Sequence, residues 1–244
     1  MTPLVDAHCH LDLYPDPARV LADSTLNACE IIAVTNAPSV FRHTFELTAK
    51  YATVHAAVGL HPQLVKTRSL ERGMLLEQLS TTKFVGEIGL DYQTKDEAEK
   101  ALQRDVFLEV VEACSKLGNR ILTIHSRRAS KDVLGILGES FRGTAILHYF
   151  SGQKRELDVA AKRGFYFSVN PAMVRAKSGQ ELIRRMEPDL VLTESDGPFV
   201  KCGRRAAEPM DVSTVVDYLS VVWGCPKELA GEKILANFKR AVGE

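Results

Sequence analysis

The chain has 244 residues, 45% of them hydrophobic and 25% charged, which excludes a disordered or fibrous protein. The chain has 31 lysines and arginines and 31 aspartates and glutamates. This neutral balance argues against binding of DNA or membranes by bulk electrostatics alone. It leaves room for a local basic patch or for metal ions that hold phosphate. The five cysteines are scattered and form no CxxC pair, which is typical of a reducing compartment. Residues Met1–Asp12 show no signal-peptide pattern, and no apolar run reaches the length of a membrane helix, about 20 residues. The sequence therefore predicts a cytoplasmic protein with no membrane partner.

Short apolar runs rich in β-branched or aromatic residues alternate along the chain with stretches of helical periodicity. The runs predicted as strands are Leu4–Ala7, Glu30–Val34, Val54–Val58, Lys83–Ile88, Ile121–Ile124, Ala145–Leu147, Phe165–Val169 and Leu190–Thr193. The stretches predicted as helices are Asp16–Cys29, Phe41–Ala49, Leu70–Leu79, Ala98–Leu117, Ala129–Gly138, Lys154–Arg163, Gly179–Met186, Val212–Val222 and Lys227–Ala241. Eight strand and helix units of roughly 30 residues each predict a (β/α)8 TIM-type barrel.

One domain over residues 1–244 is the simplest interpretation, because no linker, low-complexity tract or close repeat divides the chain. A doubly wound open sheet is the alternative fold. It usually has fewer strands, and the GxGxxG motif typical of a dinucleotide-binding sheet does not follow the first predicted strand.

The first predicted strand runs directly into His8-Cys9-His10. Residues i and i+2 of a strand point to the same side, so the two imidazoles can converge on one metal ion. A lone HxH pair is a weak motif and is more often chance or polar lining. Its position favours the metal interpretation here, because barrel active sites form at the carboxyl ends of the strands.

The same placement recurs at other predicted strand ends. Five of the seven histidines lie there (His8, His10, His61, His125, His148), together with Glu87, Glu194 and Asp196. These groups exceed what one tetrahedral zinc ion needs and suit two divalent ions bridged by a carboxylate. The predicted ligands of one ion are His8, His10 and Asp196, those of the other are His125 and His148, and Glu87 is the bridge.

Other polar residues near the strand ends are candidates for substrate contact. Asp196 can also accept a proton from the metal-activated water. We expect Glu194 to support the metal site from behind or to contact substrate. The cations predicted to contact phosphate are Arg127, Arg128, Lys201 and Arg205, with solvation as the ordinary alternative for exposed arginines. Tyr92, Tyr149 and Phe150 are candidates to stack on bases, although such aromatics more often belong to the core.

Six ordered motifs resemble the TatD family of metal-dependent hydrolases: VDAHCHLD, VGLHPQLV, VGEIGLDY, ILTIHSRRA, ILHYFSG and VLTESDGPF. The resemblance spans Val5 to about Phe199 and implies an amidohydrolase-type barrel; several family members are DNases. It implies metal roles for the same six residues that the strand ends indicate, and a substrate- or phosphate-facing role for His61. The predicted catalytic residues are therefore Asp196, Glu87 and His61, with two divalent ions (zinc, manganese or magnesium) as cofactors.

The opening HCHLDLYPDP also resembles the QatD branch, TatD-like proteins of a bacterial anti-phage system, which implies protein partners in a defence complex. Two segments depart from the family pattern. His148-Tyr149-Phe150 stands where the family often has His-Cys-Phe, and the seventh strand ends in Ser168-Val169-Asn170-Pro171 instead of a glycine-rich segment. These changes imply a substrate that differs from that of the housekeeping enzymes.

The resulting hypothesis is a metal-dependent phosphodiesterase that acts on DNA, as a 3′-exonuclease on single-stranded ends, because a closed barrel offers no long groove for a duplex. A second hypothesis keeps the metal ions but assigns them the hydrolysis of an amide or ester bond. The protein would then be an amidohydrolase or esterase that acts on a small molecule or an aminoacyl ester. A third is a metal-site protein that is active only within a partner complex. Positive charge at the mouth favours the first over the second.

Overall fold

A computed structural model describes residues 2–26 and 28–244. The strands of the barrel wall are β1 (Val5–Cys9), β2 (Glu30–Val34), β3 (Val54–Ala57), β4 (Phe84–Gly89), β5 (Arg120–His125), β6 (Gly143–His148), β7 (Tyr166–Val169) and β8 (Val191–Thr193). Most of their residues are buried, as expected for parallel strands that are covered on both faces.

The wall strands form a closed ring. They pair in chain order as β1-β2-β3 and β4-β5-β6-β7-β8, and a parallel bridge between Val58 and Val85 joins the two groups. Where β8 meets β1, the N–H of Asp196 donates to the carbonyl of His8 at 3.0 Å. The N–H of His10 donates to the carbonyl of Gly197 at 2.9 Å. The predicted (β/α)8 barrel is therefore confirmed and the open sheet is excluded.

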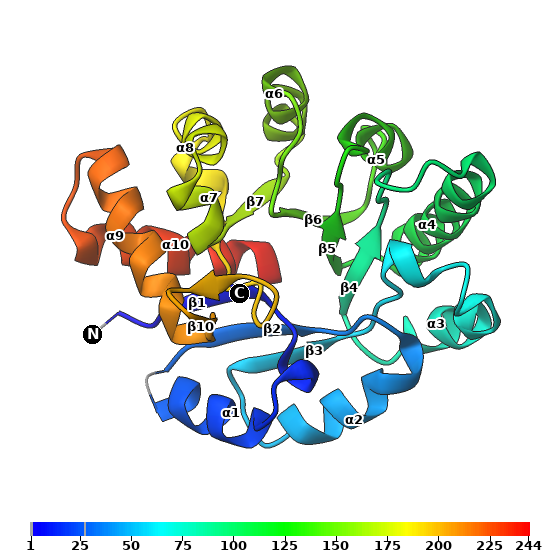
Figure 1. Cartoon of the computed structure of the whole chain (residues 1–244), viewed down its shortest axis with the longest axis horizontal. Coiled ribbons are helices and arrows are strands. Elements are labelled where there is room, and N and C mark those ends of the chain that lie inside the picture. Colours follow the sequence, from blue (N-terminus) through cyan, green and yellow to red (C-terminus); the bar gives the residue numbers. More distant parts are fainter. Residues whose placement is uncertain (1, 27) are drawn as a thin grey trace.

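Helices surround the ring of strands (Figure 1). They are α1 (Pro17–Leu26), α2 (Pro38–Thr48), α3 (Arg72–Gln78), α4 (Glu97–Leu117), α5 (Ser130–Leu137), α6 (Lys154–Lys162), α7 (Pro171–Arg175), α8 (Lys177–Ile183) and α9 (Val212–Trp223). Short 3-10 turns lie at Leu11–Leu13, Pro62–Leu64, Ser69–Glu71, Pro188–Leu190 and Pro209–Asp211. Among residues 2–26 and 28–244, no helix has both the length and the apolar character that a membrane crossing requires.

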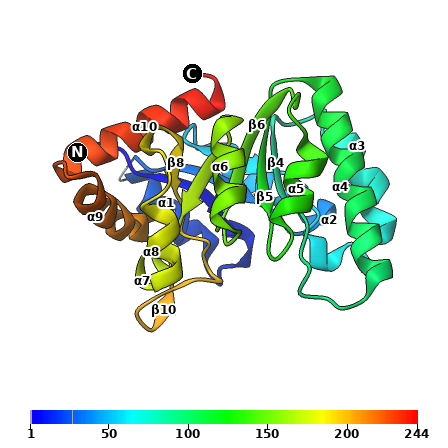
Figure 2. The same ribbon diagram turned by 90° about the horizontal axis from the view of Figure 1, so that it is seen from above.

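The last helix, α10 (Lys227–Val242), crosses the amino ends of the strands. Asn237 Nδ2 donates to the carbonyl of Val191 at the start of β8, over 2.7 Å. Near the start of β6, Thr144 Oγ1 donates to the carbonyl of Ala241 over 2.9 Å. Figure 2 shows α10 along one side of the molecule and β10 on the opposite side. The carboxyl ends of the strands are therefore the end that α10 leaves open.

Two elements near these carboxyl ends were not predicted from the sequence. Helix α7 precedes α8 because Asn170 provides a cap, with its side-chain oxygen accepting hydrogen bonds from the N–H groups of Ala172 and Met173. The predicted helix Gly179–Met186 corresponds only to part of α8 and the turn after it. A hairpin of β9 (Lys201–Cys202) and β10 (Arg205–Ala206) follows β8.

Predicted and observed boundaries differ by a few residues at the first two helices. The predicted helix Asp16–Cys29 is found as the shorter α1, Pro17–Leu26. Asn27 of this predicted helix and Met1 of the predicted domain lie outside the described residues. The predicted helix Phe41–Ala49 starts earlier, at Pro38, because proline suits the first turn of a helix, where its missing N–H costs nothing.

Candidate metal centre

The carboxylate of Glu87 lies at the centre of a ring of imidazoles. It is 3% exposed, and five histidines each place a ring nitrogen between 2.7 and 3.6 Å from one of its oxygens. The peptide that carries it is fixed: the N–H of Glu87 donates to the carbonyl of Thr35 at 3.0 Å. Glycine is required at position 59, because a Cβ atom there would collide with the Gly86–Glu87 backbone.

On the Oε2 side of Glu87, three predicted ligands come together. The Nε2 atoms of His8 and His10 lie 3.6 and 3.4 Å from Oε2 and 3.2 Å from each other. Asp196 Oδ1 lies 3.8 Å from His10 Nε2. The three side chains can offer one donor atom each within 4.8 Å of one another, which is a geometry that a single ion can use. This is the first group of ligands expected from the strand ends.

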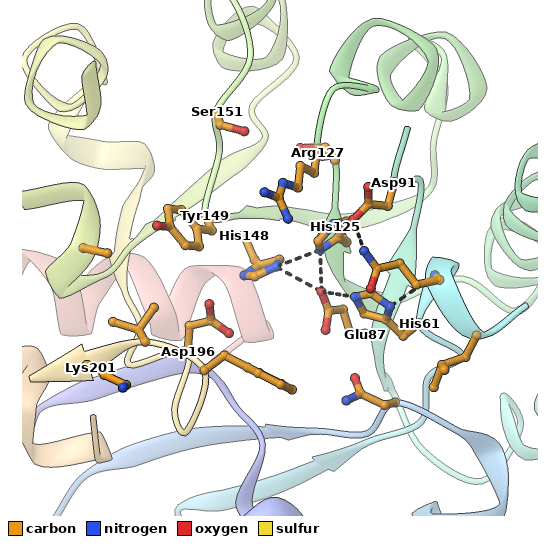
Figure 3. Close-up of a pocket in the computed structure, with 17 residues that line it drawn as sticks. His61, Glu87, Asp91, His125, Arg127, His148, Tyr149, Ser151, Asp196 and Lys201 are labelled. Carbon is orange, nitrogen blue, oxygen red and sulfur yellow. Dashed lines mark hydrogen bonds and ion pairs between the residues drawn. The ribbon is translucent and has the colours of Figure 1, made fainter. Parts of the chain in front are cut away.

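On the Oε1 side lie His125 and His148, the second predicted group. His125 Nδ1 is 2.7 Å and His148 Nε2 is 3.1 Å from Oε1 of Glu87, and these two nitrogens are 3.4 Å apart (Figure 3). His61 Nε2 is 3.5 Å from the same oxygen, so His61, Glu87 and His125 form a further possible ligand group. The position of His61 thus suits a metal ligand as well as the predicted phosphate contact.

Each of three cluster histidines has a polar partner on the far side of its ring. His125 Nε2 lies 3.0 Å from Asp91 Oδ2, and His8 Nδ1 lies 2.6 Å from Thr123 Oγ1. His148 Nδ1 lies 3.4 Å from Glu194 Oε1. The first two contacts are hydrogen bonds, which fix the ring orientation and the tautomer of a ligating histidine, and the third is an ion pair that places the Glu194 charge behind His148.

Glu194 lies behind His148 and not on the pocket wall. It is fully buried, and it accepts hydrogen bonds from Ser168 Oγ and, over 2.9 Å, from Asn170 Nδ2. Thr123, Ser168 and Asn170 are not among the site residues predicted from the sequence. Their positions on or just after β5 and β7, strands beside the cluster, are the signal that could have indicated them.

Burial and charge set the protonation of the cluster in opposite ways. Burial lowers the pKa of His8 to about 3, with the neighbouring His148 acting in the same direction, so the His8 ring is neutral. Burial also opposes protonation of His148, but Glu194 and Glu87 outweigh it and raise its pKa well above the ordinary value. Burial raises the pKa of Asp196 well above its usual range. Glu87 and Glu194 thus favour a positive charge at His148, whereas burial disfavours a negative charge at Asp196.

The cluster forms the floor of a pocket of about 770 Å³ at the open end of the barrel. Arg127 and Lys201 contribute to its wall, and Figure 3 shows them on different sides of the cluster. The other two predicted phosphate contacts do not contribute to this wall. Arg128 is exposed, and Arg205 pairs with Asp211, its Nη1 and Nη2 atoms donating to the two carboxylate oxygens at 2.6 and 2.8 Å.

Comparison with known proteins gives one consistent result. A family model described as TatD related DNase matches residues 5–243. The putative deoxyribonuclease TATDN3 of Mus musculus is 28% identical over 96% of this chain and 86% of its own. The uncharacterized metal-dependent hydrolase YabD of Bacillus subtilis is 30% identical over 95% of this chain and 94% of its own. The crystal structure of YjjV, a TatD homologue from Escherichia coli, has a TM-score of 0.87 at 22% identity, over 99% and 98% of the two chains.

Proposed function

This chain belongs to the TatD family of metal-dependent hydrolases, and we propose that it hydrolyses phosphodiester bonds in DNA, removing nucleotides from single-stranded 3′ ends. One observation carries the proposal. Five imidazoles and the Asp196 carboxyl group surround Glu87 on the floor of a pocket whose wall includes Arg127 and Lys201. Nitrogen and oxygen donors bind divalent ions, and the two cations attract phosphate.

The donor set fits two divalent ions. His8, His10 and Asp196 would hold one ion, His125 and His148 the other, and Glu87 would contribute to both. Burial keeps the pKa of His8 at about 3, so its nitrogen lone pair is free for a metal. Divalent ions would also place positive charge beside the buried carboxylates and so compensate their negative charge. When bound, such ions activate water for attack on phosphorus and stabilise charge on the leaving oxygen.

The residues of the chain then have distinct tasks. Asp196 reaches the pocket and accepts a proton from the attacking water. The water oxygen bonds to phosphorus, the P–O3′ bond breaks, and the leaving oxygen takes up a proton from solvent to become the new 3′ hydroxyl. Arg127 and Lys201 hold the phosphates on either side, and His61 contacts the phosphate at the cleaved bond.

The position of the site supports a strand end as substrate. The cluster lies at the base of a pocket in the barrel mouth, and a flexible single strand can bring its terminal phosphate there. An aminoacyl ester or another small molecule would also enter such a pocket. Arg127 and Lys201 in its wall favour the phosphodiester.

We also propose that the protein works in the reducing cytoplasm, within a multiprotein anti-phage complex. The resemblance of residues 8–17 to the QatD branch supports the defence setting. The free state of the five cysteines is compatible with a reducing compartment. Expression with and without the candidate partner proteins, followed by phage challenge of the host, tests this part separately from the chemistry.

The central experiment incubates the purified protein with single-stranded DNA, duplex DNA, RNA and an aminoacyl ester. Each substrate is supplied with Mn²⁺, Mg²⁺, Zn²⁺ or chelator. We expect metal-dependent shortening of single-stranded DNA from its 3′ end, read on 5′-labelled oligonucleotides. Inductively coupled plasma analysis of the same preparation reports the bound metal.

Two variants control this experiment. His125→Ala removes a candidate ligand and should lower activity by several orders of magnitude. His43→Ala removes an exposed histidine of α2 that lies outside the cluster, and it should leave activity unchanged. Cleavage of the ester alone would replace the proposed substrate class. Equal DNA cleavage by His125→Ala and the wild type would contradict the metal-centre assignment.

A further inference from the structure

One side of the pocket presents two aromatic rings to solvent. Phe199 is 61% exposed and Tyr149 is 38% exposed, and both contribute to the wall. Large apolar rings are normally covered, and exposed aromatic surface inside a concave site is typical of ligand contact. These two rings are therefore candidates for a contact that the metal cluster does not provide.

Both rings lie on the His10–Asp196 side of the cluster. The ring of Phe199 packs edge to face with that of His10, with centroids 4.9 Å apart and planes at 86°. Figure 3 shows Tyr149 and Asp196 on the same side of His148, away from His61. A nucleotide whose phosphate reaches the cluster would thus place its base beside these rings.

The backbone of the loop that carries Phe199 is held in place by hydrogen bonds. The loop that carries Phe199 is tied to β1 by the hydrogen bond from His10 N–H to Gly197 O at 2.9 Å. Within the loop, Val200 N–H donates to Asp196 O, also at 2.9 Å. A ring held on a fixed backbone loses little entropy when a base stacks on it.

Tyr149 is fixed in another way. It has a φ of +42°, a left-handed conformation that is costly for tyrosine. Its neighbours on both sides are anchored: His148 lies in the cluster, and Phe150 is 1% exposed and packs against Phe167. Strain of this kind is concentrated at ligand-contacting positions in proteins.

The other aromatics expected near the strand ends have different surroundings. Phe150 belongs to the core. The hydroxyl of Tyr92 donates to Asp132 Oδ2 at 2.7 Å and accepts from Arg104 Nη1 at 3.1 Å. Of the three aromatic residues considered from the sequence, Tyr149 alone lies on the pocket wall among the described residues, and Phe199 joins it there.

We propose that Phe199 and Tyr149 form a stacking platform for the nucleobase next to the cleaved phosphate, so that the enzyme selects nucleotide ends over simple phosphodiesters. The inference rests on the proposed function and specifies its substrate. Stacking on an aromatic face tolerates every base, so the platform predicts activity with little sequence preference.

The test compares two single-stranded oligonucleotides that differ only at the 3′ terminus. One ends in thymidine and the other in an abasic tetrahydrofuran residue. We expect the wild type to have a lower KM for the thymidine end, by roughly 5- to 150-fold, the range typical for one stacked base. Phe199→Leu keeps apolar volume without a π face, and Tyr149→Asn tolerates the left-handed backbone. Each should reduce the preference by raising KM for the thymidine end more than KM for the abasic end.

Conservative and remote variants complete the design. Tyr149→Phe keeps the ring and should behave as wild type. Phe45→Leu alters a 49% exposed phenylalanine on α2, outside the pocket wall, and should also have no effect. Equal losses on both oligonucleotides in Phe199→Leu would mean that the ring only shapes the pocket, and a wild type indifferent to the abasic end would overturn the platform.

A fluorescence measurement reports stacking without cleavage. A 3′-terminal 2-aminopurine, on a phosphorothioate linkage that resists hydrolysis, should be quenched on binding to wild type and not to Phe199→Leu. Quenching that is equal in both proteins contradicts the proposal. If wild type cleaves neither oligonucleotide under any metal condition, the proposed function itself fails, and this inference fails with it.

Discussion

Asp91 accepts a hydrogen bond from Nε2 of His125 over 3.0 Å, on the side of the imidazole that faces away from Glu87. Asp91 is itself fixed, since its Oδ1 accepts from Gln93 N–H and its own N–H donates to Gln103 Oε1, both at 2.8 Å. The carboxylate therefore determines which nitrogen of His125 remains available to a metal ion.

Replacing Asp91 with asparagine should weaken metal binding without unfolding the barrel. The amide keeps the shape but loses the charge that orients and polarises His125, so we expect an affinity loss of about 10- to 100-fold. Isothermal titration with Mn²⁺ or Zn²⁺ measures it. The matched control is Asp217→Asn on α9, which removes the surface ion pair with Lys227 of α10. Unchanged affinity in Asp91→Asn would show that His125 needs no such partner.

Glu194→Gln distinguishes support of His148 from contact with substrate. The buried carboxylate lies behind the histidine, and glutamine preserves much of its hydrogen bonding to Asn170. We expect kcat on DNA to fall about tenfold or more, with KM nearly constant. Arg127→Ala, at the pocket wall, should instead raise KM. A selective rise of KM in Glu194→Gln would favour the direct substrate contact considered from the sequence.

Divalent ions should stabilise the folded chain. An ion that binds only the native state at 100 times its Kd adds about 2.7 kcal/mol to the free energy of unfolding. Urea unfolding with Mn²⁺ and with chelator measures this increment. The double variant His125→Ala/His148→Ala should lose the share of the increment that comes from the second ion, whereas His43→Ala should keep the whole increment. A full increment in the double variant would place the second ion elsewhere.

The Arg205–Asp211 pair predicts an acid-dependent loss of stability. Burial opposes ionisation of Asp211, but Arg205 and the Glu208 N–H outweigh it and lower its pKa. A carboxyl whose folded-state pKa is depressed contributes stability above its unfolded pKa of about 3.9, and the contribution is lost as pH falls through the folded pKa. Asp211→Asn should therefore cost about 0.5–1 kcal/mol at pH 7, since Arg205 is half exposed, and less at pH 3.

The same pair offers a test of Arg205 as a DNA contact. If Arg205 serves mainly to hold the hairpin, Arg205→Ala and Asp211→Ala should alter KM for DNA equally. A larger KM effect of Arg205→Ala, steepened at low salt, would favour phosphate contact. Chemical denaturation at pH 7 and pH 3 measures the free energy of unfolding of Asp211→Asn, Arg205→Ala and Asp211→Ala.

Gly197→Ala should disturb the loop behind the metal centre. A Cβ atom at this position would collide with the Tyr14 hydroxyl and the Ala207 carbonyl, so we expect a loss of about 1–3 kcal/mol and reduced activity. Gly135→Ala on α5 is the control. Its Cβ meets open space, and removing a helical glycine should stabilise by about 0.5–1 kcal/mol. Thermal unfolding of the two variants should shift in opposite directions.

The fold could be predicted because its signals are local and repeated. Each strand is a short apolar run, and the ends of parallel strands meet at one edge, so the convergence of His8, His10, His125 and His148 follows from topology alone. The barrel also explains how Asp196, remote in sequence, lies beside His10: closure places β8 next to β1.

What escaped prediction depends on individual side-chain contacts that no periodic sequence pattern records. Helix α7 is only one turn and a half, too short for a periodic pattern, and it depends on the Asn170 cap. Arg205 was predicted to contact phosphate because it follows the eighth strand, whereas its guanidinium pairs with Asp211 and does not line the pocket. Asn170 supports Glu194 across the two strands, a pairing that no sequence spacing encodes.

Helix α10 covers one end of the barrel, and the pocket opens at the other end. Since α10 covers the amino ends of the strands, the proposed exonuclease reaction would release its nucleotide through the same mouth by which the DNA enters. In that reaction the remaining strand would have to withdraw before the nucleotide leaves, so each cut would end one binding event. We expect digestion to be distributive: with excess DNA, shortened intermediates of every length should accumulate together before any molecule is fully degraded.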